Sequence, residues 1–306
     1  MKRRPFVRVA VSAGLLALLA RTIDLGDVAA RLASLAPGWV VGALALSVLQ
    51  VGVSAWRWRF TAARLGLELP LGPAVAEYYL ATFLNQVLPG GVLGDVSRAW
   101  RHTRAAGAAA GLDTPARRSL AIHAVVLERA SGQTVMLGVA ALSGVVLLGG
   151  WIWGGVAGVI LAAFAWGVAR RGTRDGAAAD VPVGVVESAR RALFAPAAFG
   201  AQAASSVFVV ATYLATWWMA ARALGIDTPS VVMLPLVAPV LVTMLVPVSV
   251  AGWGVREGGA AVLWTWAGLP AADGVAISVV YGLLVLVGSL PGLGVAALSR
   301  GARSHP

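Results

Sequence analysis

The chain has 306 residues, of which 59% are hydrophobic and 12% are charged. Soluble domains contain about 45–50% apolar and about 25% charged residues, so the composition excludes a conventional soluble domain and predicts an all-α polytopic protein of a lipid bilayer. The net charge is +11, but the arginines lie mostly between apolar runs, which follows the positive-inside rule and argues against a nucleic-acid-binding protein.

A membrane-spanning helix needs about 20 mainly apolar residues, and eight segments of the chain approach that length. The first segment follows a basic N-terminus and has no small-residue cleavage site at its end, so we interpret it as an uncleaved helix rather than as a signal peptide. The eight segments cover residues 6–20, 38–56, 74–94, 119–148, 151–169, 197–221, 230–250 and 274–298.

The arginine-rich loops conflict with a simple alternation of eight spans. With the N-terminus inside, the loop 57–73 and its three arginines also lie inside. A full crossing by segment 74–94 would place the five arginines of residues 97–118 outside, which the positive-inside rule disfavours. If this segment instead enters the membrane and returns to the same side, residues 97–118 and the basic loop 170–196 both lie inside.

The same reasoning applies to segment 230–250, because its return to the outer face brings Arg300 and Arg303 inside. We therefore predict a single domain over residues 1–306, with six full spans and two re-entrant elements that enter from opposite faces. Both termini are then cytoplasmic. A plain eight-helix bundle is the alternative.

The two predicted re-entrant segments share a sequence pattern. Residues 88–98 and 246–256 both fit Pro-x4-Gly-x3-Arg, and each follows an apolar run. Paired apolar segments that Gly and Pro interrupt, in corresponding halves of a chain, indicate the substrate site of a transporter. We predict repeat-like halves around 74–148 and 230–298. The residues that shape the motif backbone are Pro89, Gly90, Gly91, Gly94, Pro247, Gly252 and Gly254.

Each motif ends in an arginine that could bind an anion. A glycine-rich turn leading into a helix exposes backbone N–H groups at the positive end of the helix dipole. An adjacent guanidinium adds a planar charged fork that suits phosphate. Arg98 and Arg256 therefore predict a site for an anionic lipid headgroup, although Arg98 is equally explained as an interfacial anchor. Asn85, just before the first motif, could hold the broken backbone or line a cavity.

Segment 119–148 carries His123, Glu128 and Arg129, and ionisable residues within a span usually face the protein interior or a cavity. Glu128 and Arg129 are sequence neighbours that point about 100° apart on a helix, so each needs a partner elsewhere. His123 could join the same face, and His123 or Glu128 could carry a proton. A purely structural ion-pair network is the alternative. The candidate partners are Arg98 or Arg256 for Glu128, and Asp95 or Glu257 for Arg129.

Four motifs follow one another along the chain in a recognisable order. They are Arg57-Trp58-Arg59, Asn85-x-x-Leu-Pro-Gly-Gly-x-x-Gly-Asp-x-x-Arg-Ala, Glu128-Arg129-x-x-Gly, and Pro247-x4-Gly-x-Gly-x-Arg-Glu-Gly. In this order they resemble the lysylphosphatidylglycerol synthase transmembrane-region family, also called flippase-like or UPF0104 proteins, over nearly the whole chain. The resemblance implies paired re-entrant helices and translocation of a lipid between leaflets. It also implies functional polar residues at Asp95, Arg98, Glu128, Arg129, Arg256 and Glu257.

We therefore expect a flippase or transporter in the plasma membrane for an anionic phospholipid or a polyprenyl-linked lipid. The full-length synthases of the family carry a cytoplasmic catalytic domain, for which this chain has no loop or tail of sufficient length. No Walker-type Gly-Lys-Ser/Thr motif is present. We accordingly expect neither lysyl transfer nor ATP hydrolysis.

Two other functions are consistent with the sequence. A lipid-modifying enzyme could use His123 and Glu128 as acid and base, but the chain has no cysteine and no Gly-x-Ser-x-Gly or His-Glu-x-x-His motif. A non-catalytic partner of a separate synthase or glycosyltransferase could dock through residues 97–118. Faces rich in small residues also allow a homo-oligomer. We expect no metal and no other cofactor, because there is no cysteine and the three histidines are far apart.

Overall fold

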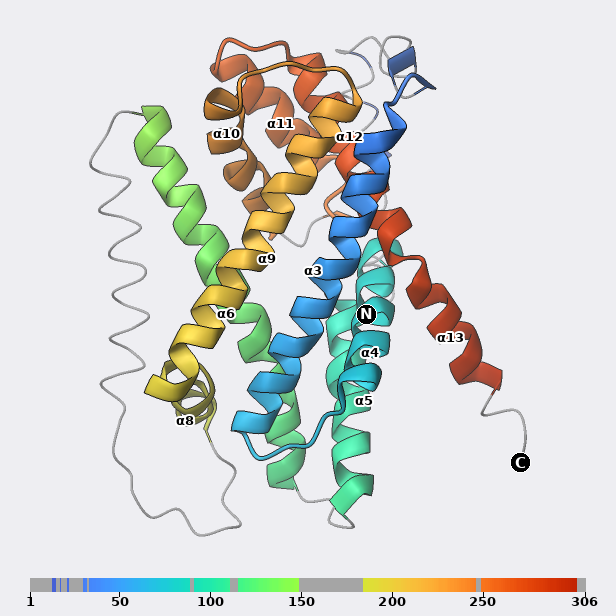
Figure 1. Ribbon diagram of the computed structural model, residues 1–306, viewed down its shortest axis with the longest axis vertical. Helices are drawn as coiled ribbons and strands as arrows, with labels where there is room; N and C mark the ends of the chain where they lie inside the picture. The colour runs from blue at the N-terminus through green and yellow to red at the C-terminus, as the bar shows by residue number, and fades with distance from the viewer. Residues whose placement is uncertain are drawn as a thin grey trace.

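The computed structural model describes residues 33–88, 91–110, 115–148, 184–245 and 249–301, together with a few isolated residues before 33. Within these ranges the chain is almost entirely helical and contains no β-strand. Figure 1 shows the helices packed as a bundle with their axes roughly along its long dimension. The helices are α3 (Pro37–Arg64), α4 (Leu71–Val87), α5 (Leu93–Ala110), α6 (Pro115–Leu148), α8 (Val185–Ala189) with a π-helical turn (Arg190–Phe194), α9 (Pro196–Ala223), α10 (Ser230–Thr243), α11 (Val255–Trp266), α12 (Ala271–Ser289) and α13 (Pro291–Gly301).

Four stretches of helix are long and apolar enough to cross a membrane. They correspond to four of the predicted spans, and the prediction of an all-α membrane protein is confirmed. The predicted spans 6–20 and 151–169 lie outside the described residues. The four stretches are Pro37–Arg64, Pro115–Leu147, Pro196–Ala223 and Ala271–Leu298.

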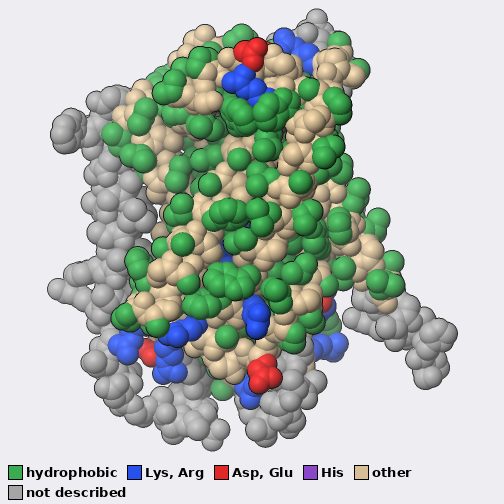
Figure 2. Space-filling model, viewed as in Figure 1, with side chains coloured by type: hydrophobic (Ala, Val, Ile, Leu, Met, Phe, Trp, Pro, Cys, Tyr) green, Lys and Arg blue, Asp and Glu red, His purple; other side chains and the backbone are tan. Residues whose placement is uncertain are grey.

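The surface between the two ends of the bundle is mostly apolar. In Figure 2 hydrophobic side chains cover the middle of the molecule, whereas arginine side chains gather mainly along its lower edge. Arg64 ends α3, and Arg190 and Arg191 lie beside the start of α9, at this same end. An apolar belt that faces lipid, with basic residues beyond it, is the pattern of a multi-pass membrane protein.

The start and stop signals of α3 and α9 are alike. Pro37 and Pro196 occupy the first helical turn, where a missing N–H costs no helical hydrogen bond. Gly66 and Gly225 follow the last turn with φ of 76° and 70°, a left-handed conformation that favours glycine. The two helices pack against each other, and both reach from one end of the bundle to the other (Figure 1).

The prediction that residues 57–64 belong to a loop is wrong, because α3 continues to Arg64. Hydropathy ends the span at its first arginine, but the structure buries that arginine. The side chain of Arg57 is 3% exposed and forms an ion pair with Glu128 of α6. A charge with a partner inside the bundle lets the helix continue through a position that hydropathy treats as polar.

Two helical hairpins enter the bundle from opposite ends. α4 and α5 pack together in the lower half of Figure 1, and α10 and α11 pack together in the upper half. This is the arrangement that two re-entrant elements require, and re-entry into a bilayer stays a prediction. The loop predicted at 97–118 is wrong over most of its length, because residues up to Ala110 form the returning helix α5.

The lower hairpin is closely packed at Gly94. A Cβ on Gly94 would lie 1.9 Å from the carbonyl oxygen of Ala81, so only glycine lets α5 approach α4 to this distance. Two apolar cores surround the hairpins. One is centred on Trp217 and Trp264 among α9 to α12, and the other on Trp58 among α3, α4, α6 and the π-helical turn.

Candidate functional site

A cavity of about 1210 Å³ lies between the two hairpins. Ligand sites commonly enclose about 300–1,000 Å³, so this volume is sufficient for a lipid headgroup with part of its chains. Both sequence motifs contribute to its wall. The polar residues on its wall include Asn85, Asp95, Arg129, Arg256 and Tyr281.

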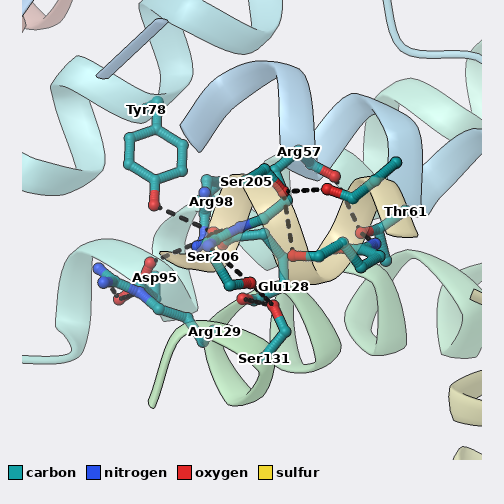
Figure 3. Close-up of polar contacts among 12 residues, drawn as sticks. Arg57, Thr61, Tyr78, Asp95, Arg98, Glu128, Arg129, Ser131, Ser205 and Ser206 are labelled. Atoms are coloured by element: carbon teal, nitrogen blue, oxygen red, sulfur yellow. Dashed lines mark hydrogen bonds and ion pairs between the residues drawn. The ribbon is translucent and has the colours of Figure 1, made fainter. Parts of the chain in front are cut away.

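Beside the cavity lies a group of five charged residues from three helices, which we call the lower charge cluster. Its three arginines and two carboxylates carry a formal charge of +3 − 2 = +1. Figure 3 shows these side chains pointing toward one another from α3, α5 and α6. The members are Arg57, Asp95, Arg98, Glu128 and Arg129.

Glu128 holds the lower charge cluster together. Its Oε1 atom accepts hydrogen bonds from Arg57 Nη2 at 2.6 Å and from the Tyr78 hydroxyl at 3.2 Å. Its Oε2 atom accepts a hydrogen bond from Arg98 Nη2 at 3.0 Å. The carboxylate is fully buried, so charge-assisted bonds from three other helices compensate its loss of water. Glu128 thus ties α3, α4 and α5 to α6.

Asp95 forms the second centre of the lower charge cluster. It accepts hydrogen bonds from Arg98 Nη2 at 2.9 Å, Arg129 Nε at 2.9 Å and the Asn85 amide at 3.0 Å. The Asn85 carbonyl oxygen in turn accepts the backbone N–H of Gly94 at 2.8 Å. Asn85 therefore joins the end of α4 to the first turn of α5 and orients Asp95 toward the cavity.

The two arginines of this cluster nearest the cavity differ in access. Arg98 is fully buried, with its guanidinium 4.4 Å from the ring centre of Tyr78 and 4.7 Å from that of Trp58. Arg129 lines the cavity, and 32% of its side chain is exposed. A molecule in the cavity would therefore meet Arg129, whereas Arg98 positions Asp95 and Glu128 from behind.

The upper hairpin carries a smaller pair that consists of Arg256 and Glu257. Glu257 Oε1 accepts hydrogen bonds from Arg256 Nη2 at 2.7 Å and from the Ser278 hydroxyl at 2.8 Å. The Glu257 Oε2 atom accepts the backbone N–H of Gly254 at 2.6 Å, which caps α11. The pair has no net charge. Arg256 also lines the cavity, so Arg129 from α6 and Arg256 from the upper hairpin face the same space.

The wall beside Arg256 is shaped by aromatic rings and a glycine. The guanidinium lies 5.0 Å from the ring centre of Trp253 and 5.4 Å from that of Tyr281, within the range of a cation–π contact. A Cβ on Gly282 would lie 2.3 Å from Arg256 Nη2. Glycine at this position therefore makes room for the guanidinium.

The structure selects among the partners that the sequence left open. Glu128 pairs with Arg98 and not with Arg256, and Arg129 pairs with Asp95 and not with Glu257. The expectation of exposed backbone N–H groups in the two motifs is wrong at two positions. The N–H groups of Gly94 and Gly254 donate to side chains of the protein, namely Asn85 and Glu257. An anion in the cavity is therefore met by guanidinium groups rather than by these two amides.

His123 does not join the lower charge cluster. Its ring nitrogens contact the hydroxyls of Ser119 and Ser188, on the side of α6 that faces α8. Both oxygens of Glu128 are occupied by arginine contacts. The arrangement supports a structural ion-pair network at Glu128. Neither His123 nor Glu128 lines the cavity, where a proton carrier would be expected to lie.

The sequence prediction missed Arg57 and Tyr78. Hydropathy places Arg57 in a loop. Its position at the end of an apolar run and beside Trp58 is the signal that indicates an interfacial or buried side chain. Tyr78 gave no signal beyond a phenol within an apolar segment. Both contact Glu128 in the structure.

Part of the motif backbone lies outside the described residues, namely Pro89, Gly90 and Pro247. Among the described positions, Gly91, Gly252 and Gly254 have φ of 64°, 83° and 85°. These left-handed conformations explain why glycine occupies the turns that begin α5 and α11. No group of His, Asp or Glu within the described ranges is arranged to hold a metal ion.

The model of the family described as "Lysylphosphatidylglycerol synthase TM region" matches residues 6–292. The chain belongs to this family. The match covers both hairpins, the lower charge cluster and the Arg256–Glu257 pair, so the family assignment and the geometry concern the same part of the molecule. Membership places the chain among membrane proteins related to lipid synthesis or flipping. No curated protein matches the chain.

Proposed function

We propose that the protein moves an anionic phospholipid or a polyprenyl-linked anionic lipid between the leaflets of the plasma membrane, with both termini cytoplasmic. The observation that carries this proposal is the shared cavity between the two opposed hairpins, which Arg129 of α6 and Arg256 of the upper hairpin both line. A protein that carries a charged headgroup across the membrane needs polar side chains at the depth of the hydrocarbon core, where lipid provides no polar contacts. Arg129 and Arg256 supply them.

The charged groups around the centre of the cavity favour an anion. The lower charge cluster has a formal charge of +1 and the Arg256–Glu257 pair has none, so the two together retain one positive charge. Charge in a poorly solvated space is costly unless a partner compensates it. A headgroup with one phosphate diester supplies that compensation, and a zwitterionic headgroup supplies less of it.

The opposed hairpins also suit movement between leaflets. The two hairpins lie toward opposite ends of the bundle (Figure 1), and residues of both line the cavity. Alternating access in transporters with such repeats occurs by movement of one element against another around a fixed site. The cavity with Arg129 and Arg256 fits the position of that fixed site.

The test uses purified protein in liposomes that contain fluorescently labelled phosphatidylglycerol or phosphatidylcholine. A membrane-impermeant reductant bleaches the outer leaflet, and the slower loss of the remaining signal measures lipid movement. We expect faster movement of phosphatidylglycerol, and loss of this preference in Arg129→Gln and Arg256→Gln.

Arg222→Gln is the matched control, because Arg222 lies at the upper end of α9, pairs with Asp227 and is not part of the cavity wall. This variant should move lipid as the wild type does. Folded wild-type protein that moves neither lipid refutes the proposal. Equal movement of both lipids refutes the anionic preference.

An enzymatic function receives less support from the geometry. An acid and a base must both reach the reacting group. Within the described residues, His123 lies away from the cavity and Glu128 is held by arginines. The remaining carboxylate on the cavity wall, Asp95, already accepts three hydrogen bonds.

A further inference from the structure

Two apolar stripes follow the cavity wall from its centre toward the basic end of the bundle. On α5 and the turn before it, Val92, Val96 and Trp100 are four residues apart and therefore share one face. On α6, Ile122 and Val126 have the same spacing. All five line the cavity and are 45–60% exposed. Large apolar side chains in such numbers on an open wall suit acyl chains.

Each stripe ends in an arginine at the same end of the molecule. Arg104 is four residues beyond Trp100, and Arg118 is four residues before Ile122. Both are exposed and both line the cavity. α5 ends at Ala110 and α6 begins at Pro115, so the two arginines come from adjoining helix ends, on the side where the described basic residues gather.

Arg104 is prepared to bind a phosphate. Its guanidinium lies 4.1 Å from the ring centre of Trp100. A stacked guanidinium uses its face for the aromatic ring and keeps its N–H groups in the plane for another partner. Within the described residues Arg104 has no carboxylate partner. By contrast, Arg190 and Arg191 at the same end pair with Glu187 at 3.4 and 2.7 Å.

This position is separate from the central arginines. Asp95 and Arg104 are nine positions apart on α5, which corresponds to about 14 Å along the helix. That separation is larger than a phosphate group, so one headgroup does not contact Arg104 and the lower charge cluster together. The apolar stripe between them can hold the chains of a lipid whose headgroup is at either position.

We propose that Arg104 and Arg118 form a loading site for the phosphate of an anionic phospholipid in the cytoplasmic leaflet, with Trp100 at the headgroup boundary and the acyl chains on the stripe. The inference deepens the proposed function, because this lipid is the one that the central arginines would receive. Binding at this site is a property of its own and does not depend on translocation.

The experiment measures quenching of Trp100 by brominated acyl chains. Protein is reconstituted in vesicles that contain brominated phosphatidylglycerol or brominated phosphatidylcholine, and the contribution of Trp100 is the difference between the wild type and Trp100→Phe. We expect stronger quenching by phosphatidylglycerol. Each arginine near an anionic surface contributes about 1 kcal/mol, so each neutralisation should lower the relative affinity about fivefold.

The deciding variants are Arg104→Gln, Arg118→Gln and their combination, with Arg190→Gln/Arg191→Gln as the matched control. The control removes the same charge from the same end but does not touch the cavity wall. Arg104→Lys keeps the charge and should retain most of the preference. Equal quenching by the two lipids in the wild type overturns the proposal, as does an equal loss in the control.

The two proposals can fail separately. Preferential quenching without any lipid movement supports the loading site and refutes the transport function. Arg129→Gln that abolishes movement but leaves the Trp100 quenching unchanged shows that the two sites are distinct. Loss of quenching in Arg129→Gln, with the protein folded, overturns the loading site as a separate position.

Discussion

The two hairpins have the same sequence pattern but hold their arginines differently. Arg98 of the lower hairpin belongs to a cluster whose members come from α3, α5 and α6. Arg256 of the upper hairpin pairs with its own sequence neighbour and with Ser278 of α12. Around the upper hairpin the remaining contacts are mainly apolar, with Trp217, Trp264 and other buried side chains.

The difference indicates that the lower hairpin is fixed by charge and the upper hairpin by packing. A buried ion-pair network has a few discrete geometries and loses much of its energy when a member moves. Apolar surfaces can slide with smaller loss because their contacts are not directional. We therefore infer that the lower hairpin is the fixed wall of the cavity and the upper hairpin its adaptable wall.

The sharpest test of this comparison is Glu128→Gln. The change removes the carboxylate that buried Arg57 contacts and one of the two that buried Arg98 contacts, and breaking a buried pair in this way costs about 3–5 kcal/mol. We expect a marked loss in the free energy of unfolding, measured by titration with a denaturing detergent. Glu187→Gln, an exposed pair at the same end, should change stability by less than about 1 kcal/mol. A small effect at Glu128 would mean that charge does not fix the lower hairpin.

Gly94→Ala tests the backbone contact of the lower hairpin. The added Cβ would meet the Ala81 carbonyl at 1.9 Å, and neither backbone can yield without separating α4 from α5. Overpacking typically costs about 1–3 kcal/mol, and we expect the upper end of that range. Thermal unfolding in detergent measures the loss. Gly200→Ala is the control, because a Cβ there meets nothing within 4 Å; similar losses at both positions would contradict the close approach.

Glu257→Gln applies the first test to the upper hairpin and should have a smaller effect. One arginine–carboxylate contact is lost instead of two, and an amide oxygen can still accept from Ser278 or the Gly254 N–H. Hydrogen bonds to charged groups contribute about 1.5–3 kcal/mol, so we expect a loss of about 2 kcal/mol. The same detergent titration compares it with Glu128→Gln. If Glu257→Gln destabilises the protein more, the assignment of the two walls is reversed.

The smallest expected effect is at Ala251, a cavity residue of the upper turn with φ of 50°. Ala251→Gly removes the steric strain of the left-handed conformation in the folded state, which stabilises the protein. It also raises the conformational entropy of the unfolded chain, which destabilises the protein by a similar amount. We expect a change below about 0.5 kcal/mol in thermal unfolding. Ala251→Val, which is β-branched, should lose about 1–2 kcal/mol. Equal stability of the Gly and Val variants would contradict strain at this turn.

Composition and hydropathy predicted the membrane class and the four described spans because lipid exposure requires long apolar runs. They did not predict where helices end when the end carries arginines that form ion pairs. Arg57, Arg98 and Arg101 reduce hydropathy, and only the folded bundle shows how they pair with Glu128, Asp95 and Glu77. Charge counting therefore placed loops where the chain forms α3 and α5.

The candidate site was predictable in its members but not in its pairing. The arginine motifs and the polar residues of segment 119–148 could be found by spacing and by the cost of charge in lipid. The sequence could not decide whether Glu128 pairs with Arg98 or with Arg256, because the choice depends on how deeply each hairpin extends into the bundle. It also could not show that Arg98 is buried while Arg129 is open to the cavity, since this depends on the rings of Trp58 and Tyr78.

The pair Arg57–Glu128 has a consequence for biosynthesis. The two residues are 71 positions apart in the chain, so α3 leaves the ribosome well before α6 exists. At about 5–20 residues per second, Arg57 waits about 4–14 s for its counter-charge. An unpaired arginine costs about 2.5–3.5 kcal/mol at the centre of an inserting helix and less toward its end, where Arg57 lies, so α3 is expected to stay shallow or in contact with the insertion machinery until α6 arrives. Completion of α6 would then release both helices into the membrane together.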